Sequence, residues 1–497
     1  MRKIIASFLT FCLLAACKLF STPTPVPPTA TPIVIPPDDF SLFADGLVAS
    51  AKPILDNMDG ATLYEIEFVI DDDLVHIAGS EKVRFTNRET VPLDEIQFRL
   101  YPNILGGEMH VDEVRVDGQA LVPAYRLDDS LLAIPLPQPL AVGQSVHIEM
   151  DFDLAVPTEL ESNYGVLASY DGVLTLAHAY PMIEVYDDEG WNAEIPSSNG
   201  DLTHGDMAFF IVTVDAPKDL TVVGAGIESQ PEFNGDRQRI TFAAGPVRDF
   251  FLAASADYEV VSRTVGEVTV NSYAPAELEE GARFAMEAAV RAIEIFSKGY
   301  APYPYTEFDI AATPTYALGV EYPGATAITR DIYELGGTRN DTPVSIYLES
   351  TVVHEVGHQW FYNLVGNDQL DDPWLDESLV QYITWQYYLE TYGESGAAGF
   401  EASLNGRWGR VNFEPIPIGL PVAEYSGTEY SAIVYGRGPF FFETLQDEIG
   451  SEAFDAFIRD YTETYSWGIA TSEGLQSLAE EHCACDLDDL FDEWVYP

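Results

Sequence analysis

"VVHEVGHQWF", residues 352–361, is the stretch that decides how this sequence is interpreted. His354 and His358 stand four residues apart in an apolar run, and Glu355 directly follows the first histidine. On an α-helix, residues four apart lie one above the other on the same face. Two imidazoles with this spacing can bind one Zn²⁺, and the adjoining glutamate can act as a base on a water molecule. The segment therefore predicts a zinc site.

A catalytic zinc site needs a third protein ligand and an open coordination position. Eighteen residues separate His358 from Glu377, which lies in "WLDES". Glu377 falls early in the next predicted helix, and this helix could pack antiparallel to the first and bring the carboxylate to the metal. The alternative is an exposed glutamate in the first turn of a helix. We expect one zinc per chain, held by His354, His358 and Glu377.

The charge balance excludes one class of partner. Among 497 residues there are 24 Lys+Arg and 81 Asp+Glu, which gives a formal net charge of -57. Such a surface repels phosphate backbones, so we expect no nucleic-acid partner. It suits a well-solvated exterior and attracts cationic ligands, including the amino groups of peptides, with an attraction that salt weakens.

The N-terminus predicts export. Residues 1–16 have a positive end and an apolar stretch too short to span a bilayer, as in a signal peptide. "LAAC" resembles a bacterial lipobox, which implies lipid attachment at Cys17; the alternative is an ordinary secretory signal with a chance cysteine. Residues 17–39 continue as a Pro/Thr-rich stalk. We expect a bacterial lipoprotein, anchored to the membrane of the cell envelope by lipid, with its catalytic body outside the cytoplasm.

Two further cysteines, Cys483 and Cys485, stand close together in "EHCACD". A disulfide across one residue is feasible but tight, and a metal site would need more ligands than His482 adds. Whether the pair is bridged stays open from the sequence.

The spacing of apolar residues changes along the chain and divides it into two regions. In residues 40–262, segments such as "TLYEIEFVI" and "SVHIEMDFDL" alternate apolar and polar positions, which predicts a β-sandwich domain. After this point "AELEEGARFAMEAAVRAIEIFSKGY" has helical spacing. We therefore expect a multidomain α+β protein, in which residues 263–497 form a largely helical domain that carries the zinc segment. The extended "GATAIT", residues 324–329, is expected to be an edge strand that pairs with the substrate.

"HEVGHQWFYNLVGNDQLDDPWLDESLVQY" is similar throughout to the zinc segment of the peptidase family M1 aminopeptidases, gluzincins that include leukotriene hydrolases. The resemblance implies a thermolysin-like catalytic domain preceded by a β-sandwich. It also implies zinc held by His354, His358 and Glu377, with Glu355 as general base. The implied activity is hydrolysis of the N-terminal peptide bond of peptides that have a free N-terminus, and we expect a monomer.

"ALGVEYPG" resembles the family's Gly-x-Met-Glu-Asn segment. The resemblance implies that Glu321 binds the substrate's amino terminus and that Gly319 and Val320 belong to the same substrate-binding segment. Leu318, Val320 and Tyr322 depart from the usual Gly, Met and Asn, which affects the shape of the first subsite. The alternative for Glu321 is a surface carboxylate on a loop.

"IVYGRGPFFFETL" looks like the family's Tyr-x-Lys-Gly segment, with Arg437 in place of lysine. The resemblance implies that Tyr435 stabilises the tetrahedral intermediate, and Tyr430 and Tyr425 are the alternatives. Two other functions remain open: a zinc endopeptidase with a more open cleft, because the segment around Glu321 is altered, and a non-catalytic peptide-binding lipoprotein of the same fold.

Overall fold

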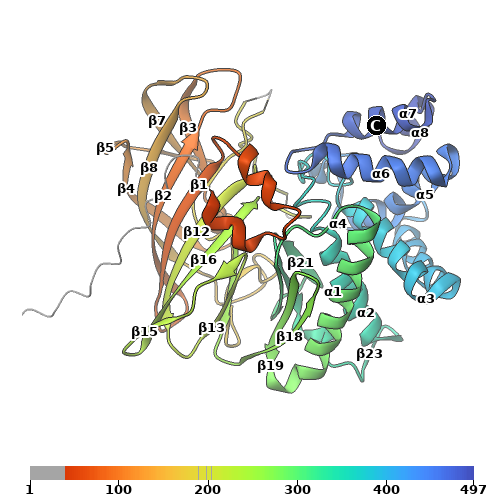
Figure 1. Ribbon diagram of the computed structural model, residues 1–497, viewed down its shortest axis with the longest axis horizontal. Helices are drawn as coiled ribbons and strands as arrows, with labels where there is room; N and C mark the ends of the chain where they lie inside the picture. Colours follow the sequence, from red (N-terminus) through yellow and green to blue (C-terminus); the bar gives the residue numbers. More distant parts are fainter. Residues whose placement is uncertain (1–39, 188–189, 198, 203) are drawn as a thin grey trace, which may run out of the picture. The chain divides into compact units, whose positions relative to one another are not determined.

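The computed structural model of the protein describes residues 40–187, 190–197, 199–202 and 204–497 (Figure 1). The predicted signal peptide, Cys17 and the stalk lie outside these residues. Within the described part of the chain, no helix combines the length and apolar character needed to cross a bilayer.

The first half of the described chain is built from strands. A nine-stranded sheet has the order β14-β16-β12-β1-β2-β8-β4-β5, with β15 also paired to β16. Its strands are β1 (Thr62–Ile70), β2 (His76–Thr86), β4 (Glu108–Val116), β5 (Gln119–Ala120), β8 (Ser145–Ala155), β12 (Ala208–Pro217), β14 (Ile227–Glu228), β15 (Glu232–Asn234) and β16 (Arg237–Val247). Alternate residues of β8 are buried and exposed, because one face of the sheet packs on the core and the other meets water.

Two four-stranded sheets pack against this sheet through a shared apolar core. One has the order β13-β17-β10-β9 and the other β11-β3-β7-β6. Their strands are β3 (Leu93–Arg99), β6 (Ala124–Arg126), β7 (Leu131–Leu140), β9 (Leu167–Tyr170), β10 (Val173–Ala177), β11 (Met182–Ile183), β13 (Thr221–Gly224) and β17 (Phe251–Ser255). This arrangement is the predicted β-sandwich.

A five-stranded sheet with the order β18-β19-β20-β22-β21 follows. It consists of β18 (Tyr258–Val265), β19 (Val268–Pro275), β20 (Glu307–Thr313), β21 (Gly319–Tyr322) and β22 (Ala325–Thr329). The boundary that we expected at residue 262 falls inside β18. The expectation that residues 324–329 form the edge strand is wrong, because β22 is paired on both sides and β21 is the edge.

Helices make up most of the remaining chain and lie beside this sheet (Figure 1). They are α1 (Glu279–Gly299), α2 (Val344–Gly357), α3 (Glu377–Trp408), α4 (Gly427–Ala432), a π-helix η8 (Ile433–Arg437), α5 (Gly438–Ile449), α6 (Ser451–Tyr465), α7 (Ser472–Cys483) and α8 (Asp488–Trp494). Short 3-10 turns lie at Ser41–Gly46, Lys52–Asn57, Tyr101–Asn103, Ala276–Leu278, Arg330–Ile332, Gly409–Val411 and Val422–Glu424, and β23 (Thr338–Arg339) pairs with β24 (Thr342–Pro343). Cys483 and Cys485 form a disulfide at the end of α7. The predicted order along the chain, a β-sandwich followed by a largely helical domain, is confirmed.

One acidic side chain is buried in the sandwich core. Glu81 of β2 lies opposite Ile66 of β1 and Met150 of β8, and it is 1% exposed. Neither of its carboxyl oxygens has a hydrogen-bond partner among the described residues. Burial raises the pKa of Glu81 well above its ordinary value, because the charged form would lose its hydration.

We predict that Glu81→Leu stabilises the protein, and more at pH 8 than at pH 5. The raised pKa means that, above the unfolded-state value near 4.5, the folded protein holds a proton that the unfolded chain has released. Raising the pH through this window therefore favours the unfolded state of the wild type. We expect a gain of about 1–3 kcal/mol at pH 8, the scale for a buried polar group without a partner, measured by urea unfolding. Asp151→Leu, at an exposed position of β8, is the control, and an equal effect of both substitutions would contradict the prediction.

Candidate metal centre

Three side chains meet where the end of α2 faces the start of α3. His354 lies in the last turn of α2, His358 caps its C-terminus, and Glu377 is the first residue of α3. The two Nε2 atoms are 3.2 Å apart. Glu377 Oε2 lies 3.0 Å from His354 Nε2 and 3.5 Å from His358 Nε2. The structure thus brings the three predicted ligands together.

These distances can be compared with a real coordination sphere. Donors about 2.0–2.1 Å from a tetrahedral zinc ion are separated from each other by about 3.3 Å. The three donor separations bracket this value. All three residues are buried, and two imidazoles with one carboxylate form a common catalytic zinc set. The residues present therefore fit a zinc ion.

The surroundings orient the ligands and favour a cation. His358 Nδ1 lies 3.1 Å from the Phe361 carbonyl oxygen, which suits a donated hydrogen bond that leaves Nε2 free to bind metal. Burial lowers the pKa of His354 to about 4 and so keeps this imidazole neutral. Although burial alone would raise the pKa of Glu377, His358 and His354 hold it well below its ordinary value. A neutral imidazole and an ionised carboxylate are the forms that bind metal.

Glu355 lies beside the metal ligands with a free carboxylate. It is 4% exposed, and no described residue donates a hydrogen bond to its side chain. Burial and then Glu321 raise its pKa well above the ordinary value. A carboxylate group from each of Glu355 and Glu321 and a His358 ring nitrogen lie within 4.8 Å of one another. Glu355 can therefore exchange a proton with a molecule bound at the centre.

Gly319 is needed where β21 passes this carboxylate. A Cβ atom at residue 319 would lie 2.3 Å from Glu355 Oε1. No side chain fits without displacing Glu355, so the glycine is explained by the close approach of the edge strand. Val320, the next residue, is half-buried.

Glu321 projects from the edge strand into the same site. It is 6% exposed, and Gln369 Nε2 donates to its Oε1 at 3.0 Å. The same Gln369 nitrogen donates to Asp376 Oδ2 at 2.8 Å, and Asp376 Oδ1 accepts from the backbone N–H of Glu377. The alternative of a surface carboxylate for Glu321 is therefore wrong. Gln369 fixes Glu321 relative to the first turn of α3.

Gln359 joins the hairpin of β21 and β22 to the metal helix. Its Nε2 donates to the Tyr322 carbonyl oxygen at 2.9 Å, and its Oε1 accepts from the Gly324 N–H at 2.8 Å. Both bonds are buried. The sequence analysis missed the roles of Gln359, Gln369 and Asp376. An aspartate directly before a helix is a recognisable N-cap signal, but nothing in the local pattern marks the two glutamines.

Tyr435 reaches the centre from the π-helix η8. Its hydroxyl donates a hydrogen bond to Glu377 Oε1. α3 and η8 approach closely, because Ser378 Oγ donates to the Val434 carbonyl oxygen at 2.7 Å and a Cβ at Gly438 would lie 1.9 Å from that Oγ. An extra residue in a helical turn is frequent at functional sites, and here it directs Tyr435 at a metal ligand.

The neighbours of Tyr435 have other roles. Tyr430 packs against it, with ring centroids 5.6 Å apart. Tyr425 donates to the Pro417 carbonyl oxygen and is not directed at the centre. Arg437 is 2% exposed; it donates to the carbonyl oxygens of Ile416 and Trp494 and stacks on the Trp494 ring. Arg437 therefore ties the C-terminal helix to η8.

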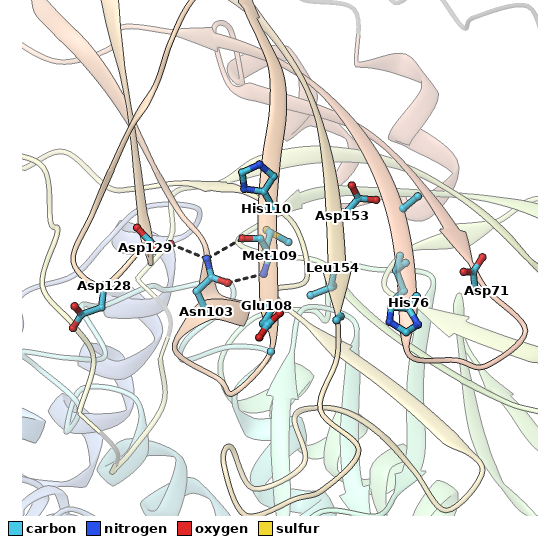
Figure 2. A pocket seen from close by; sticks show the side chains of 14 residues that line it. Asp71, His76, Asn103, Glu108, Met109, His110, Asp128, Asp129, Asp153 and Leu154 are labelled. Carbon is cyan, nitrogen blue, oxygen red and sulfur yellow. Dashed lines mark hydrogen bonds between the residues drawn. The ribbon is translucent and has the colours of Figure 1, made fainter.

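A separate open groove of about 690 Å³ lies on the sandwich, and Figure 2 shows the residues that line it. It runs along the ends of β2, β4 and β8 and carries several aspartates together with His76 and His110. Both histidines are exposed. None of the residues of the metal centre lines this groove.

The chain resembles known proteins. Residues 284–494 match the Peptidase family M1 domain. Aminopeptidase M1-B of Oryza sativa subsp. japonica is 23% identical over 419 residues, which cover 78% of this chain and 45% of that protein. Probable aminopeptidase 2 of Sulfurisphaera tokodaii is 24% identical over 303 residues, which cover 58% of this chain and 38% of that protein. The chain thus spans less than half the length of either relative.

Solved structures share the fold. The M1 zinc metallopeptidase from Deinococcus radiodurans is 20% identical with a TM-score of 0.64, covering 88% of this chain and 94% of its own. A mutant of that metallopeptidase bound to a Tyr-ser-ala substrate is also 20% identical, with a TM-score of 0.63 and coverage of 88% and 93%. The arrangement of sandwich, five-stranded sheet and helices is therefore that of a known two-part fold.

We predict one zinc per chain in the wild type and in Glu355→Gln, and loss of zinc in Glu377→Ala. Glu377 supplies a donor atom, whereas Glu355 lies beside the donor set without belonging to it. The measurement is elemental analysis after zinc loading and dialysis, with circular dichroism to confirm folding. Unchanged zinc content in folded Glu377→Ala would show that the metal binds elsewhere.

Proposed function

We propose that this chain, whose residues 284–494 match the Peptidase family M1 domain, is a zinc-dependent aminopeptidase that removes the first residue of peptides with a free N-terminus. One observation carries the proposal: the buried Glu321 carboxylate lies beside Glu355 and His358, within 4.8 Å. A carboxylate at this distance from the centre can hold an ammonium group so that the adjoining peptide bond reaches the metal.

The charges of the site support a cationic metal and a cationic substrate group together. Glu321, Glu355, Asp376 and Glu377 are all buried within one small region. Burial and then Glu377 raise the pKa of Asp376 to about 7, because both disfavour its charged form. A divalent ion and one ammonium would relieve this repulsion.

His354, His358 and Glu377 would hold the ion. When bound, zinc polarises a water molecule and the carbonyl of the peptide bond. The free carboxylate of Glu355 accepts the proton of the attacking water and passes it to the leaving nitrogen. Because Gly319 has no side chain, nothing on β21 blocks this carboxylate.

Tyr435 supports the reaction from the π-helix η8. Its hydroxyl already donates to Glu377 Oε1. In the complex the same hydroxyl donates to the oxyanion that develops on the substrate carbonyl. The rigid attachment of η8 to α3 by Ser378 fixes the direction of this donor.

The open edge of β21 provides a template for the substrate backbone. Backbone groups of an antiparallel strand point alternately toward and away from its partner. Since the Thr329 N–H donates to the Leu318 carbonyl oxygen, Gly319 and Glu321 direct their backbone groups away from β22. An extended peptide can add to this edge. An endopeptidase would have to place uncharged backbone against buried Glu321, which is unfavourable, so the aminopeptidase is the better supported function.

We predict that Glu321→Ala lowers kcat/KM for a free tripeptide by about 10²–10⁴, the scale of a broken buried ion pair. An N-acetyl cap should cost the wild type a similar factor, because it deletes the same contact. The two losses should not add when the variant meets the capped substrate. The measurement is initial rates with free and acetylated peptides.

Two variants serve as controls for this experiment. Glu334→Ala, at an exposed position of the same domain, should leave the ratio of free to capped rates unchanged. Glu355→Gln should lose activity by several orders of magnitude without losing zinc. Equal wild-type rates on capped peptides cut internally and free peptides would replace this proposal with a zinc endopeptidase.

We further propose that the protein is a lipid-anchored monomer with its catalytic body outside the cytoplasm. The support is the sequence "LAAC" before the proline-rich residues 17–39. Lipid on Cys17 would anchor the chain to a membrane of the cell envelope.

We predict that Cys17→Ser moves the protein from the membrane fraction to a soluble or unprocessed form. The expected acyl groups are detected on the native N-terminal peptide by mass spectrometry. Cys485→Ser, distant in sequence, should remain in the membrane fraction. Unchanged membrane partitioning of Cys17→Ser without any acyl group would reject the anchor.

A further inference from the structure

Arg407 is a cation beside Tyr435 that forms no ion pair with any described carboxylate. It lies in the last turn of α3, and its guanidinium carbon is 5.6 Å from the centroid of the Tyr435 ring. Its side chain is half-buried. In the described part of the chain no carboxylate lies within 4.0 Å of it and no group accepts a hydrogen bond from it. Glu377 acts on Arg407 only electrostatically, so the guanidinium donors have no acceptor among the described residues.

Two more arginines lie in the same neighbourhood. Arg410 follows in the next turn of chain and acts electrostatically on Arg407. Arg339 of β23 stands over the Tyr347 ring, with its guanidinium carbon 6.0 Å from the ring centroid. Tyr347 also interacts electrostatically with Arg407, so these groups lie near one another at one end of the site. No described carboxylate lies within 4.0 Å of Arg339 or Arg410.

About half of the described arginines pair with a carboxylate, and Arg407 does not. With 81 acidic residues and 24 basic ones, a basic side chain readily finds a carboxylate. Arg99, Arg239 and Arg283, for example, pair with Glu184, Glu67 and Glu279. Other described arginines, such as Arg248 and Arg437, also have no carboxylate within 4.0 Å, but they donate to backbone carbonyl oxygens instead. The feature that favours an anionic ligand is therefore the position of Arg407 beside Tyr435.

The cluster lies at the end of the centre opposite Glu321. Glu321 acts electrostatically on His358, whereas Arg407 acts on His354. His354 and Tyr347 are two helical turns apart on α2 and share one face. Glu321 of β21 is thus on the side of His358, and Arg407 of α3 is on the side of His354. A peptide whose amino group binds Glu321 would continue past the metal ligands toward Arg407.

We propose that Arg407 binds a carboxylate on the C-terminal side of the bond that is cut, and so selects short or acidic peptides. This inference rests on the proposed aminopeptidase function and names its substrate class. The guanidinium is planar and permanently charged, and it offers paired donors that match a carboxylate. The carboxylate can come from the free C-terminus of a short peptide or from an acidic side chain near the cleaved bond.

The local charge therefore opposes the charge of the whole surface. The net charge of -57 attracts cations at a distance, and Glu321 receives the substrate's ammonium. Arg407 would bind a carboxylate at the other end of the substrate, and only when the two groups are in direct contact. A zwitterionic short peptide satisfies both ends at once.

The test uses four tripeptides and measures kcat and KM separately. Ala-Ala-Ala is compared with its C-terminal amide, and the amides of Ala-Glu-Ala and Ala-Gln-Ala distinguish a side-chain carboxylate from the C-terminal one. We expect the wild type to prefer at least one carboxylate-bearing member over its uncharged partner by about 10–100-fold in kcat/KM, mainly through KM. Arg407→Met should abolish this preference, and Arg407→Lys should restore part of it.

Controls separate the proposal from a structural role and from the proposed function. Arg283→Met, an exposed arginine of α1, should keep the wild-type preference. A uniform fall in kcat for every substrate in Arg407→Met, with unchanged ratios, would overturn the proposal and assign Arg407 to the support of Tyr435. Should the wild type hydrolyse none of the peptides, the aminopeptidase function fails, and calorimetry with the acid and amide forms on zinc-loaded Glu355→Gln still tests Arg407. Equal affinities there would overturn the inference.

Discussion

The contact between Glu377 and the two histidines is the interaction on which the rest of this structure depends. It joins the last turn of α2 to the first residue of α3, and it lies in the protein interior with further carboxyl groups close by. Such a concentration of buried acids is unfavourable unless positive charge is supplied. The cation-binding capacity of the site is thus tied to how these two helices meet.

Two sets of side-chain hydrogen bonds hold this junction in place. Asp376 caps α3 and is held by Gln369, which also reaches Glu321. Ser378 bonds the π-helix, which aims Tyr435 at Glu377. Each support is a side chain that forms a hydrogen bond with another element. The positions of Glu321 and Tyr435 are therefore set by packing between elements and not by any one helix.

The sequence predicted the main features for physical reasons. The spacing of His354 and His358 follows from one helical turn, and alternating apolar residues predicted the sandwich strands, such as β8. The edge strand was misassigned, because strand order depends on tertiary pairing and "GATAIT" has the same local pattern whether it is central or at an edge. Gln359 and Gln369 act across long sequence separations, so no local pattern reveals them. That Arg407 forms no ion pair within the described part of the chain is likewise visible only in three dimensions.

The length of the hairpin of β21 and β22 limits how much of an extended peptide could lie between Glu321 and the metal centre. β21 ends at Tyr322, one residue beyond Glu321, and Gln359 fastens the turn that follows to the metal helix. A peptide lying along this edge meets the end of its template at its own first residue. Each residue of a strand advances about 3.3 Å. Suppose that each strand of the hairpin were two residues longer and that the glutamate now at position 321 moved along by two residues. The substrate could then place two more residues between this glutamate and the metal. If the proposed aminopeptidase function holds, the length of this one short strand would set the size of the released fragment.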